Sequence, residues 1–196
     1  YDAWLMVDEA HSIGVLGKTG KGIAEHFGID PTEVEIWMGT LSKTFSSCGG
    51  YIAGSKVLCD YLKVSAPGFV FSVGLSAALA GAAIASAELL EQEPERVAKL
   101  QKNGALFLEL AKEAGLNTGP SAGYAVVPVI VGDSASAATL SNRLLAKGIN
   151  ALPVIFPAVP EKSARIRFFI TSEHTEDQIR RAVETTASEL DAMRAD

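Results

Sequence analysis

The first part of the sequence contains three short apolar runs, and each one borders polar or glycine residues. Ala3 to Val7 ends at Asp8, Glu35 to Met38 ends at Gly39, and Tyr51 to Ala53 follows Gly49-Gly50. Runs this short, separated by stretches long enough for helices, are typical of an α/β fold. Open α/β sheets bind ligands beyond the carboxyl ends of their strands. We therefore expect the functional site where these runs border polar residues.

Apolar periodicity predicts two consecutive helices in the middle of the chain, Leu75 to Glu91 and Pro94 to Ala114. The remaining sequence predicts strand, helix, strand, strand and helix, at Ala125 to Val131, Ala135 to Ala146, Ile149 to Phe156, Arg165 to Thr171 and from Thr175 onward. Pro153 should confine its strand to an edge. We expect a domain boundary between residues 92 and 93, which separates residues 1–92 from residues 93–196.

The composition is that of a globular protein, and the charge argues against a nucleic-acid partner. Of 196 residues, 48% are hydrophobic and 20% are charged, and the formal net charge is −6. Because there is no basic excess to neutralise phosphates, we expect no nucleic-acid partner. Cys48 and Cys59 have neither metal-ligand nor disulfide spacing. This predicts no metal site and a reducing, cytoplasmic compartment.

Two further features concern the extent of the chain and membranes. The chain starts at Tyr1 without a signal-peptide pattern and enters a predicted buried strand at Trp4, which suggests part of a longer protein. The apolar stretch from Phe69 to Leu90 is long enough to be weighed as a membrane span. Its richness in alanine, glycine and serine favours a buried, closely packed helix instead, so we expect no transmembrane segment.

The segment Gly39-Thr40-Leu41-Ser42-Lys43-Thr44 sets a lysine among hydroxyl groups just past a predicted strand. One interpretation is a surface lysine in a loop rich in serine and threonine. The other is a lysine that attacks a carbonyl group, with the surrounding hydroxyl and backbone N–H groups binding a phosphate. The glycines at positions 14, 17, 20 and 22 match neither the dinucleotide fingerprint nor the Walker pattern.

Asp8 and His11 lie in a second polar segment, Asp8-Glu9-Ala10-His11-Ser12, at the end of the first apolar run. Taken alone, Asp8 is a candidate for a helix N-cap, since aspartate is common there. Taken alone, His11 is more typical of a hydrogen-bonded structural histidine than of a catalytic group. Each residue therefore keeps an ordinary interpretation beside a functional one.

A combination of motifs along nearly the whole chain favours the functional interpretations. They are Asp8 to Ser12, the glycines at 14, 17, 20 and 22, Gly39 to Lys43, Gly49-Gly50-Tyr51, Phe69 to Ser72, Val126 to Val129, Arg165 to Arg167 and Glu173-His174-Thr175. Together they resemble the α-oxoamine synthases, a family of fold-type I pyridoxal-phosphate enzymes. The resemblance implies the C-terminal half of such an enzyme. Residues 1–92 would end the large cofactor-binding domain, and residues 93–196 would form the small C-terminal domain.

The resemblance implies a role for three residues around the cofactor, pyridoxal 5'-phosphate. Lys43 would form the Schiff base and then take the Cα proton of the substrate. Asp8 would keep the pyridine nitrogen protonated through a charge-assisted hydrogen bond, so that the ring acts as an electron sink. His11 would lie near the phenolic oxygen of the ring and the incoming acyl carbonyl, as a hydrogen-bond donor or acid.

Four more residues would bind the phosphate and the substrate. Thr40 would bind the cofactor phosphate, and Arg167 would clamp the amino-acid carboxylate in a bidentate pair, with Arg165 as the weaker candidate. Ser72 stands where many members have a threonine that reaches the phosphate of the partner subunit's site. The sequence also departs from the family at Ser46-Ser47, which replaces a stretch that commonly contains glycine.

The implied reaction condenses a small amino acid with an acyl thioester, either acyl-CoA or an acylated carrier protein, with loss of CO2. Family members are homodimers with sites at the subunit interface, so we expect a dimer. Two alternatives remain open. One is another fold-type I enzyme, such as an aminotransferase, which shares the aspartate and the lysine. The other is a non-catalytic fragment that acts only in packing or dimerisation.

Overall fold

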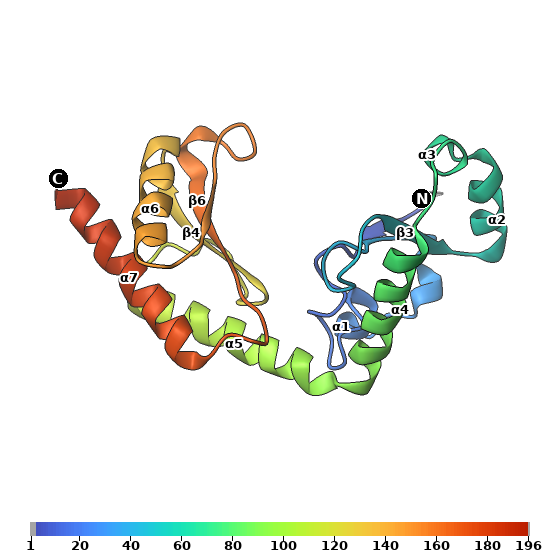
Figure 1. Ribbon diagram of the computed structural model, residues 1–196, viewed down its shortest axis with the longest axis horizontal. Coiled ribbons are helices and arrows are strands. Elements are labelled where there is room, and N and C mark those ends of the chain that lie inside the picture. The colour runs from blue at the N-terminus through green and yellow to red at the C-terminus, as the bar shows by residue number, and fades with distance from the viewer. Residues whose placement is uncertain (1–2, 196) are drawn as a thin grey trace. The chain divides into compact units, whose positions relative to one another are not determined.

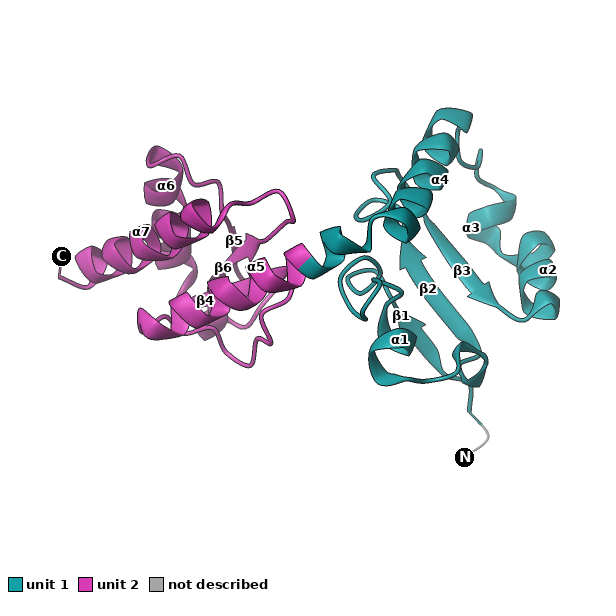
Figure 2. Cartoon of the chain, turned by 90° about the horizontal axis from the view of Figure 1, so that it is seen from below, with its two compact units in different colours: residues 1–98 teal, residues 99–196 magenta. Residues whose placement is uncertain are grey.

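The computed structural model describes residues 3–195, and the chain divides into two compact units, residues 1–98 and residues 99–196 (Figure 2). Helices and strands follow one another along both units, so the predicted α/β class is confirmed. The expected boundary between residues 92 and 93 lies shortly before the end of the first unit. The assignment of the two parts to a large and a small domain stays a prediction.

In the first unit, β2 (Ile36–Thr40) is the middle strand of a three-stranded sheet. β1 (Met6–Asp8) runs parallel to it, with Asp8 opposite Met38. β3 (Gly50–Gly54) runs antiparallel to it, with Gly50 opposite Thr40. The carboxyl ends of β1 and β2 therefore lie at the same edge of the sheet, and β3 begins at that edge.

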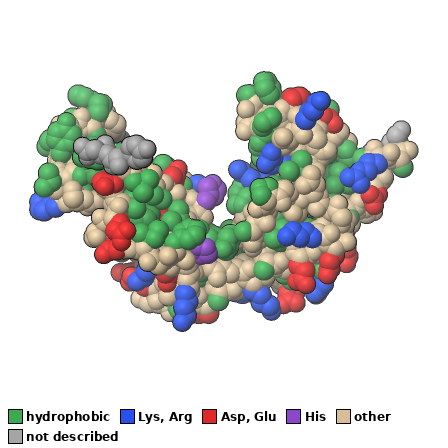
Figure 3. All heavy atoms as spheres, turned by 180° about the vertical axis from the view of Figure 1, so that it is seen from behind, with side chains coloured by type: hydrophobic (Ala, Val, Ile, Leu, Met, Phe, Trp, Pro, Cys, Tyr) green, Lys and Arg blue, Asp and Glu red, His purple; other side chains and the backbone are tan. Residues whose placement is uncertain are grey.

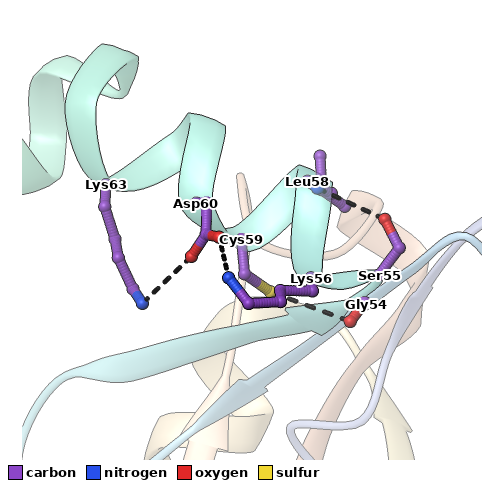
Figure 4. A network of polar contacts seen from close by, with 7 residues as sticks. All are labelled: Gly54, Ser55, Lys56, Leu58, Cys59, Asp60 and Lys63. Carbon is purple, nitrogen blue, oxygen red and sulfur yellow. Dashed lines mark hydrogen bonds and ion pairs between the residues drawn. The ribbon is translucent and has the colours of Figure 1, made fainter.

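The helical segments of the first unit are α1 (Ile23–Phe27), the 3-10 turn η1 (Pro31–Glu33), α2 (Lys56–Ser65), α3 (Pro67–Val70) and α4 (Ala77–Gln92). Figure 4 shows the start of α2, where Ser55 Oγ accepts a hydrogen bond from Leu58 N at 3.2 Å. Asp60 pairs with Lys56 and, at 3.6 Å, with Lys63. The hydrogen bond from Lys56 lowers the pKa of Asp60. All three charged side chains are exposed, so this network is a solvated helix surface.

The second unit packs three helices against one face of an antiparallel sheet (Figure 1). The helices are α5 (Pro94–Glu113), α6 (Ser134–Ala146) and α7 (Glu176–Ala195), and the strands, in sheet order, are β4 (Val126–Gly132), β6 (Ala164–Phe169) and β5 (Leu152–Val154), with the short turn η2 (Glu161–Ser163) before β6. Phe107, Leu140, Leu144, Ile166 and Ile179 are among its fully buried side chains. This unit therefore has a continuous hydrophobic core.

Local features of the second unit agree with the sequence. Thr175 N donates to Gln178 Oε1 at 2.9 Å, and Thr175 Oγ1 accepts from Gln178 N at 3.2 Å, which is a capping box at the start of α7. Asp133 Oδ1 accepts from Ser136 N at 2.8 Å and caps α6. Pro153 lies in β5, which is an edge strand. The predicted start of α7 and the predicted edge position are confirmed.

The two units differ in how much apolar surface they bury. Among residues 3–195, 16 of the 19 buried hydrophobic residues lie in the second unit, and 16 of the 21 exposed large hydrophobic residues lie in the first. Figure 3 shows hydrophobic side chains gathered on the surface of the first unit. The first unit is therefore held together by hydrogen bonds and partial burial more than by a closed core.

Two sequence expectations about burial are wrong for the described chain. Trp4, which precedes β1, is 72% exposed, so the side chain is not buried by any element within residues 3–195. α4 forms as predicted but contains no buried residue. Its alanines and glycine would allow close packing against another element, yet the described part of the chain supplies none that covers it fully.

No helix within residues 3–195 combines the length and the apolar character needed to cross a membrane. In the same residues, no three side chains of histidine, cysteine, aspartate or glutamate gather closely enough to hold a metal ion. Cys48 and Cys59 are free thiols, and Cys48 is exposed.

We predict that Asn103→Ala destabilises the second unit. Asn103 is 3% exposed, and its Nδ2 donates to Thr171 O at 3.0 Å and to His174 O at 2.9 Å. The substitution removes the donor from both carbonyl groups, so we expect the free energy of unfolding to fall by about 1–3 kcal/mol. Urea titration followed by circular dichroism measures this change.

Lys102→Ala is the matched control, because Lys102 precedes Asn103 on α5 and forms an exposed ion pair with Glu176 at 2.7 Å. We expect its free energy of unfolding to change by less than about 0.5 kcal/mol. Equal losses in the two variants would contradict the role given to Asn103.

Candidate functional site

Asp8 lies at the carboxyl end of β1, and its side chain is exposed. Its Oδ1 accepts a hydrogen bond from Ala10 N at 2.8 Å, which is a local turn contact. The next helix begins only at Ile23, so the N-cap interpretation of Asp8 is wrong. The second carboxylate oxygen, Oδ2, can accept a hydrogen bond from a ligand beyond the strand end.

Lys43 lies in the loop between β2 and β3, and its side chain is exposed. Backbone hydrogen bonds hold this loop: Leu41 N donates to Gly49 O at 2.9 Å, Ser47 N to Leu41 O at 2.8 Å, and Ser46 N to Lys43 O at 3.0 Å. Ser46 has a φ of 49°, in the left-handed region that costs a non-glycine residue roughly 1–2 kcal/mol. The strained residue therefore falls within the two serines that replace a glycine-containing stretch.

Hydroxyl groups gather where β2 ends. Thr40 Oγ1 lies 2.8 Å from Ser42 Oγ and 3.1 Å from its acceptor Gly49 O. Ser42 N donates to Thr40 Oγ1 at 3.2 Å. These contacts fix two hydroxyl groups beside the backbone N–H groups of a tight turn, an arrangement that suits an anion.

A side-chain hydrogen bond joins the lysine loop to the turn that follows β1. Thr44 Oγ1 donates to Ile13 O at 2.7 Å. Gly14 has a φ of 77°, and a Cβ there would lie 2.3 Å from Thr44 Cγ2, so only glycine allows this approach. The structure therefore brings the segments that carry Asp8 and Lys43 to one edge of the sheet.

His11 and Ser72 lie in different surroundings. His11 is exposed in the turn that links Asp8 to Ile13. Ser72 follows α3, where its Oγ donates to Phe69 O and accepts from Gly74 N, both at 3.4 Å. Ser72 also lines an apolar cavity of about 870 Å³ between β3 and α2. Within residues 3–195, no hydrogen bond joins Ser72 to the residues at the strand ends.

Arg165 and Arg167 belong to the second unit, where the alternation along β6 directs both to the face opposite the core. Arg165 Nε donates to Ser163 O at 2.8 Å. The guanidinium carbon of Arg167 lies 4.7 Å from the ring centroid of Phe169, which is a cation–π contact. Phe169 thus orients the exposed planar group of Arg167, whereas Arg165 already binds its own backbone.

The glycine-rich segment after β1 folds onto the carboxylate of Glu25, in α1. Glu25 accepts hydrogen bonds from Thr19 N, Thr19 Oγ1 and Lys21 N at 2.9–3.1 Å. Burial opposes ionisation of Glu25, but these hydrogen bonds and the charge of Lys21 outweigh it and lower the pKa of the carboxyl. Gly17 makes room, since a Cβ there would lie 2.2 Å from Glu25 Oε2. These N–H and O–H donors of the glycine-rich loop therefore bind the carboxylate of Glu25.

The profile of the aminotransferase class I and II family matches residues 1–185, which span both units. The chain belongs to this family. Membership in the aminotransferase class I and II family agrees with the motif resemblance, because fold-type I enzymes share a lysine and an aspartate at strand ends.

Among relatives of this aminotransferase class I and II chain, 8-amino-7-oxononanoate synthase 1 of Bacillus velezensis is 43% identical over 188 residues, which cover 96% of this chain and 48% of the relative. The solved 8-amino-7-oxononanoate synthase of Francisella tularensis has a TM-score of 0.85 and 28% identity, and the match covers 97% of this chain and 56% of that one. A solved serine palmitoyltransferase with a PLP internal aldimine has a TM-score of 0.91 and 25% identity, over 98% of this chain and 48% of that one.

These similarities confirm the resemblance to the α-oxoamine synthases and the fold-type I architecture. The chain spans about half the length of the curated relatives it matches. The site residues themselves stay predictions.

The structure gives roles to three residues that lie in the sequence motifs but had no role of their own there: Glu9, Thr44 and Tyr51. Glu9 is buried beside Asp8, and Thr44 holds the lysine loop. Tyr51 lies against Gly39, where a Cβ would come within 2.3 Å of the tyrosine hydroxyl. A glycine inside a strand is the one sequence signal of such a close approach.

We predict that Glu25→Gln flattens the acid dependence of stability. A carboxyl whose pKa is lowered on folding stabilises the fold above its unfolded value, about 4.5, and this contribution is lost as the pH falls through the lower folded value. The free energy of unfolding of the variant should therefore decrease less than that of the parent between about pH 5 and about pH 3. Urea titrations across this range measure both slopes.

Glu113→Gln, at the exposed end of α5, controls for the loss of one negative charge. Its pH profile should run parallel to that of the parent. A Glu25→Gln profile that is also parallel would show that Glu25 stabilises the glycine loop no more than a surface carboxylate does.

Proposed function

We propose that this chain is the C-terminal half of a pyridoxal-phosphate-dependent acyltransferase, which condenses a small amino acid with an acyl thioester and releases CO2. The observation that carries the proposal is that the segments carrying Asp8 and Lys43 lie at the same edge of the sheet, beyond the carboxyl ends of two parallel strands. Relatives named 8-amino-7-oxononanoate synthase support the reaction class, and a structural neighbour solved with PLP supports the cofactor.

The donor set at the strand ends fits pyridoxal 5'-phosphate. Its aldehyde, ring nitrogen and phosphate call for an amine, a carboxylate and O–H or N–H donors. Lys43 and Asp8 supply the first two, and Thr40 and Ser42 supply hydroxyl groups fixed 2.8 Å apart. When bound, the cofactor supplies an electron sink for the amino-acid Cα.

Each side chain then has one task. Asp8 would keep the ring nitrogen protonated through a charge-assisted hydrogen bond. Thr40 would bind the phosphate, for which its hydroxyl hydrogen would turn away from Gly49 O. Lys43 would hold the cofactor covalently; once the incoming amino acid has displaced it, its free amine would take the proton from the Cα of the amino acid. His11 donates a hydrogen bond to the acyl carbonyl, where negative charge develops.

Arg167, supported by Phe169, binds the carboxylate of the amino acid as a bidentate pair. Arg165 is the weaker candidate, because its Nε already donates to Ser163 O. Carboxylate binding positions the amino acid for loss of its α-proton.

We further propose that the whole protein is a cytoplasmic homodimer, in which Ser72 binds the cofactor phosphate in the partner subunit's site. The free thiols of Cys48 and Cys59 support a reducing compartment. Light scattering on a protein of the relatives' length tests the dimer, and an active monomer would contradict it.

We predict that Lys43 carries the cofactor. Titration with pyridoxal phosphate, followed by borohydride reduction and peptide mass mapping, should label Lys43 in the parent chain, and Lys43→Ala should lose the label. Lys56→Ala is the control, because Lys56 is also an exposed lysine and lies on the solvated face of α2. Labelling of another lysine would overturn the assignment.

The same titration on this chain and on a longer protein separates an incomplete enzyme from a non-catalytic packing fragment. Cofactor binding that appears only in the longer protein would show that this half contributes part of the site. Release of CO2 and free thiol during turnover distinguishes the acyltransferase from an aminotransferase, which releases neither.

We predict that Arg167→Lys raises KM for the amino acid by about 10- to 100-fold, which corresponds to the loss of a charged hydrogen bond. KM for the acyl thioester should change less than about threefold, since that substrate does not bind Arg167. Arg165→Lys is the matched control on the same strand face. Steady-state kinetics measure both constants, and a larger effect in the control would transfer the role to Arg165.

A further inference from the structure

Glu9 is a buried carboxylate that directly follows Asp8 in the chain. Its residue is 4% exposed, although it directly follows the exposed Asp8. Its backbone N donates to Met38 O at 2.7 Å and extends the pairing of β1 with β2 by one residue. A buried carboxylate is costly unless several donors satisfy it. We therefore expect several hydrogen-bond donors around the Glu9 carboxylate.

Donors from two segments satisfy the Glu9 carboxylate. Ile23 N, at the start of α1, lies 3.0 Å from one oxygen and 3.2 Å from the other. Ser12 Oγ, which is also buried, donates to Oε2. A Cβ on Gly22 would lie 2.5 Å from Oε2, and Gly22 has a φ of 86°. Glycine at position 22 is thus required by the place that the carboxylate occupies.

The same residue holds the turn that carries His11. Glu9 O accepts from Ser12 N at 3.0 Å and from Ile13 N at 3.3 Å. Together with the Ser12 hydroxyl bond, these contacts fix both ends of a turn whose preceding residue is Asp8. Ile13 O in turn accepts from Thr44, the neighbour of Lys43. Glu9 is therefore connected to the lysine loop through the backbone of Ser12 and Ile13 and the hydrogen bond from Thr44.

The negative charge of Glu9 also affects Tyr51, which lies on β3, the strand on the other side of β2. Burial raises the pKa of Tyr51 on β3, and the negative charge of Glu9 raises it further. Tyr51 fits against β2 only because residue 39 is glycine. Glu9 thus interacts with all three strands of the sheet next to the edge where the candidate site lies.

We propose that Glu9 is a positioning residue for the cofactor: its carboxylate binds Ser12 Oγ and Ile23 N and so fixes the turn that aims Asp8 and His11. Ile13, the chain neighbour of Ser12, connects that turn through Thr44 to the loop that carries Lys43. The inference rests on the proposed function, since it concerns how these residues meet pyridoxal phosphate. Glu9 itself touches neither cofactor nor substrate. Its contribution is the orientation of Asp8 toward the ring nitrogen.

The test uses a protein of the relatives' full length and compares Glu9→Gln and Glu9→Ala with the parent. Two quantities are measured: the dissociation constant for pyridoxal phosphate, from fluorescence quenching, and the pH midpoint at which the absorption band of the bound cofactor changes. We expect Glu9→Ala to weaken cofactor binding by about tenfold or more, the effect of one charged hydrogen bond. Glu9→Gln keeps the volume and one acceptor oxygen, so we expect a smaller loss of affinity and a clear shift of the pH midpoint.

Glu25→Gln is the matched control, because Glu25 is a second carboxylate that binds the same glycine loop. Its partners Thr19 and Lys21 lie farther along the chain from Asp8 and His11 than Ser12 does. We expect its cofactor affinity to stay within about twofold and its pH midpoint to be unchanged. Circular dichroism checks the fold of every variant. If Glu9→Ala fails to fold, Glu9→Gln decides the matter.

Parent-like affinity and midpoint in Glu9→Gln would overturn the proposal, and so would equal changes in Glu25→Gln. In both cases the parent still binds cofactor, so the proposed function stands while the role of Glu9 fails. A parent that binds no pyridoxal phosphate would overturn the proposed function and the role of Glu9 together.

Discussion

The parallel pairing of β1 with β2 brings two strand ends to one edge of the sheet, and the candidate site depends on it. Asp8 lies opposite Met38. Thr40, at the end of β2, and Lys43, in the loop that follows, therefore lie at the same edge of the sheet as Asp8. Parallel strands need a long crossover. Here the crossover contains the glycine loop and α1, whose first N–H group returns to the carboxylate of Glu9.

The loops at this edge are ordered by hydrogen bonds more than by burial. Thr44 reaches the turn after β1, and the two ends of the lysine loop bind each other at Leu41 and Gly49. Such contacts leave the side chains of Asp8, His11 and Lys43 exposed while fixing the backbone that carries them. A site that must admit a cofactor and two substrates needs this combination of a rigid backbone and accessible groups.

The sequence predicted the elements well, because proline, glycine and capping residues mark their limits locally. Thr175 and Pro153 are examples, since the first begins α7 and the second lies on an edge strand. Asp8 and Lys43 were found because polar residues at the ends of apolar runs stand out. The motif resemblance then connected them to one kind of chemistry.

Features that depend on contacts between distant segments could not be predicted in this way. An apolar run such as Trp4 to Met6 looks the same whether its strand is covered or exposed, and the structure leaves it exposed. The antiparallel direction of β3 depends on the pairing between Thr40 and Gly50. The burial of Glu9 opposes its charge, so composition and periodicity give no sign of it.

The uneven distribution of buried residues has a consequence for folding. With 16 of the 19 buried hydrophobic residues in residues 99–196, most of the apolar free energy of folding belongs to that unit. Its core is continuous, so its amide protons should exchange with solvent mainly through cooperative opening of the whole unit. We expect the first unit of this chain to open through smaller local fluctuations, because few of its hydrophobic side chains are buried.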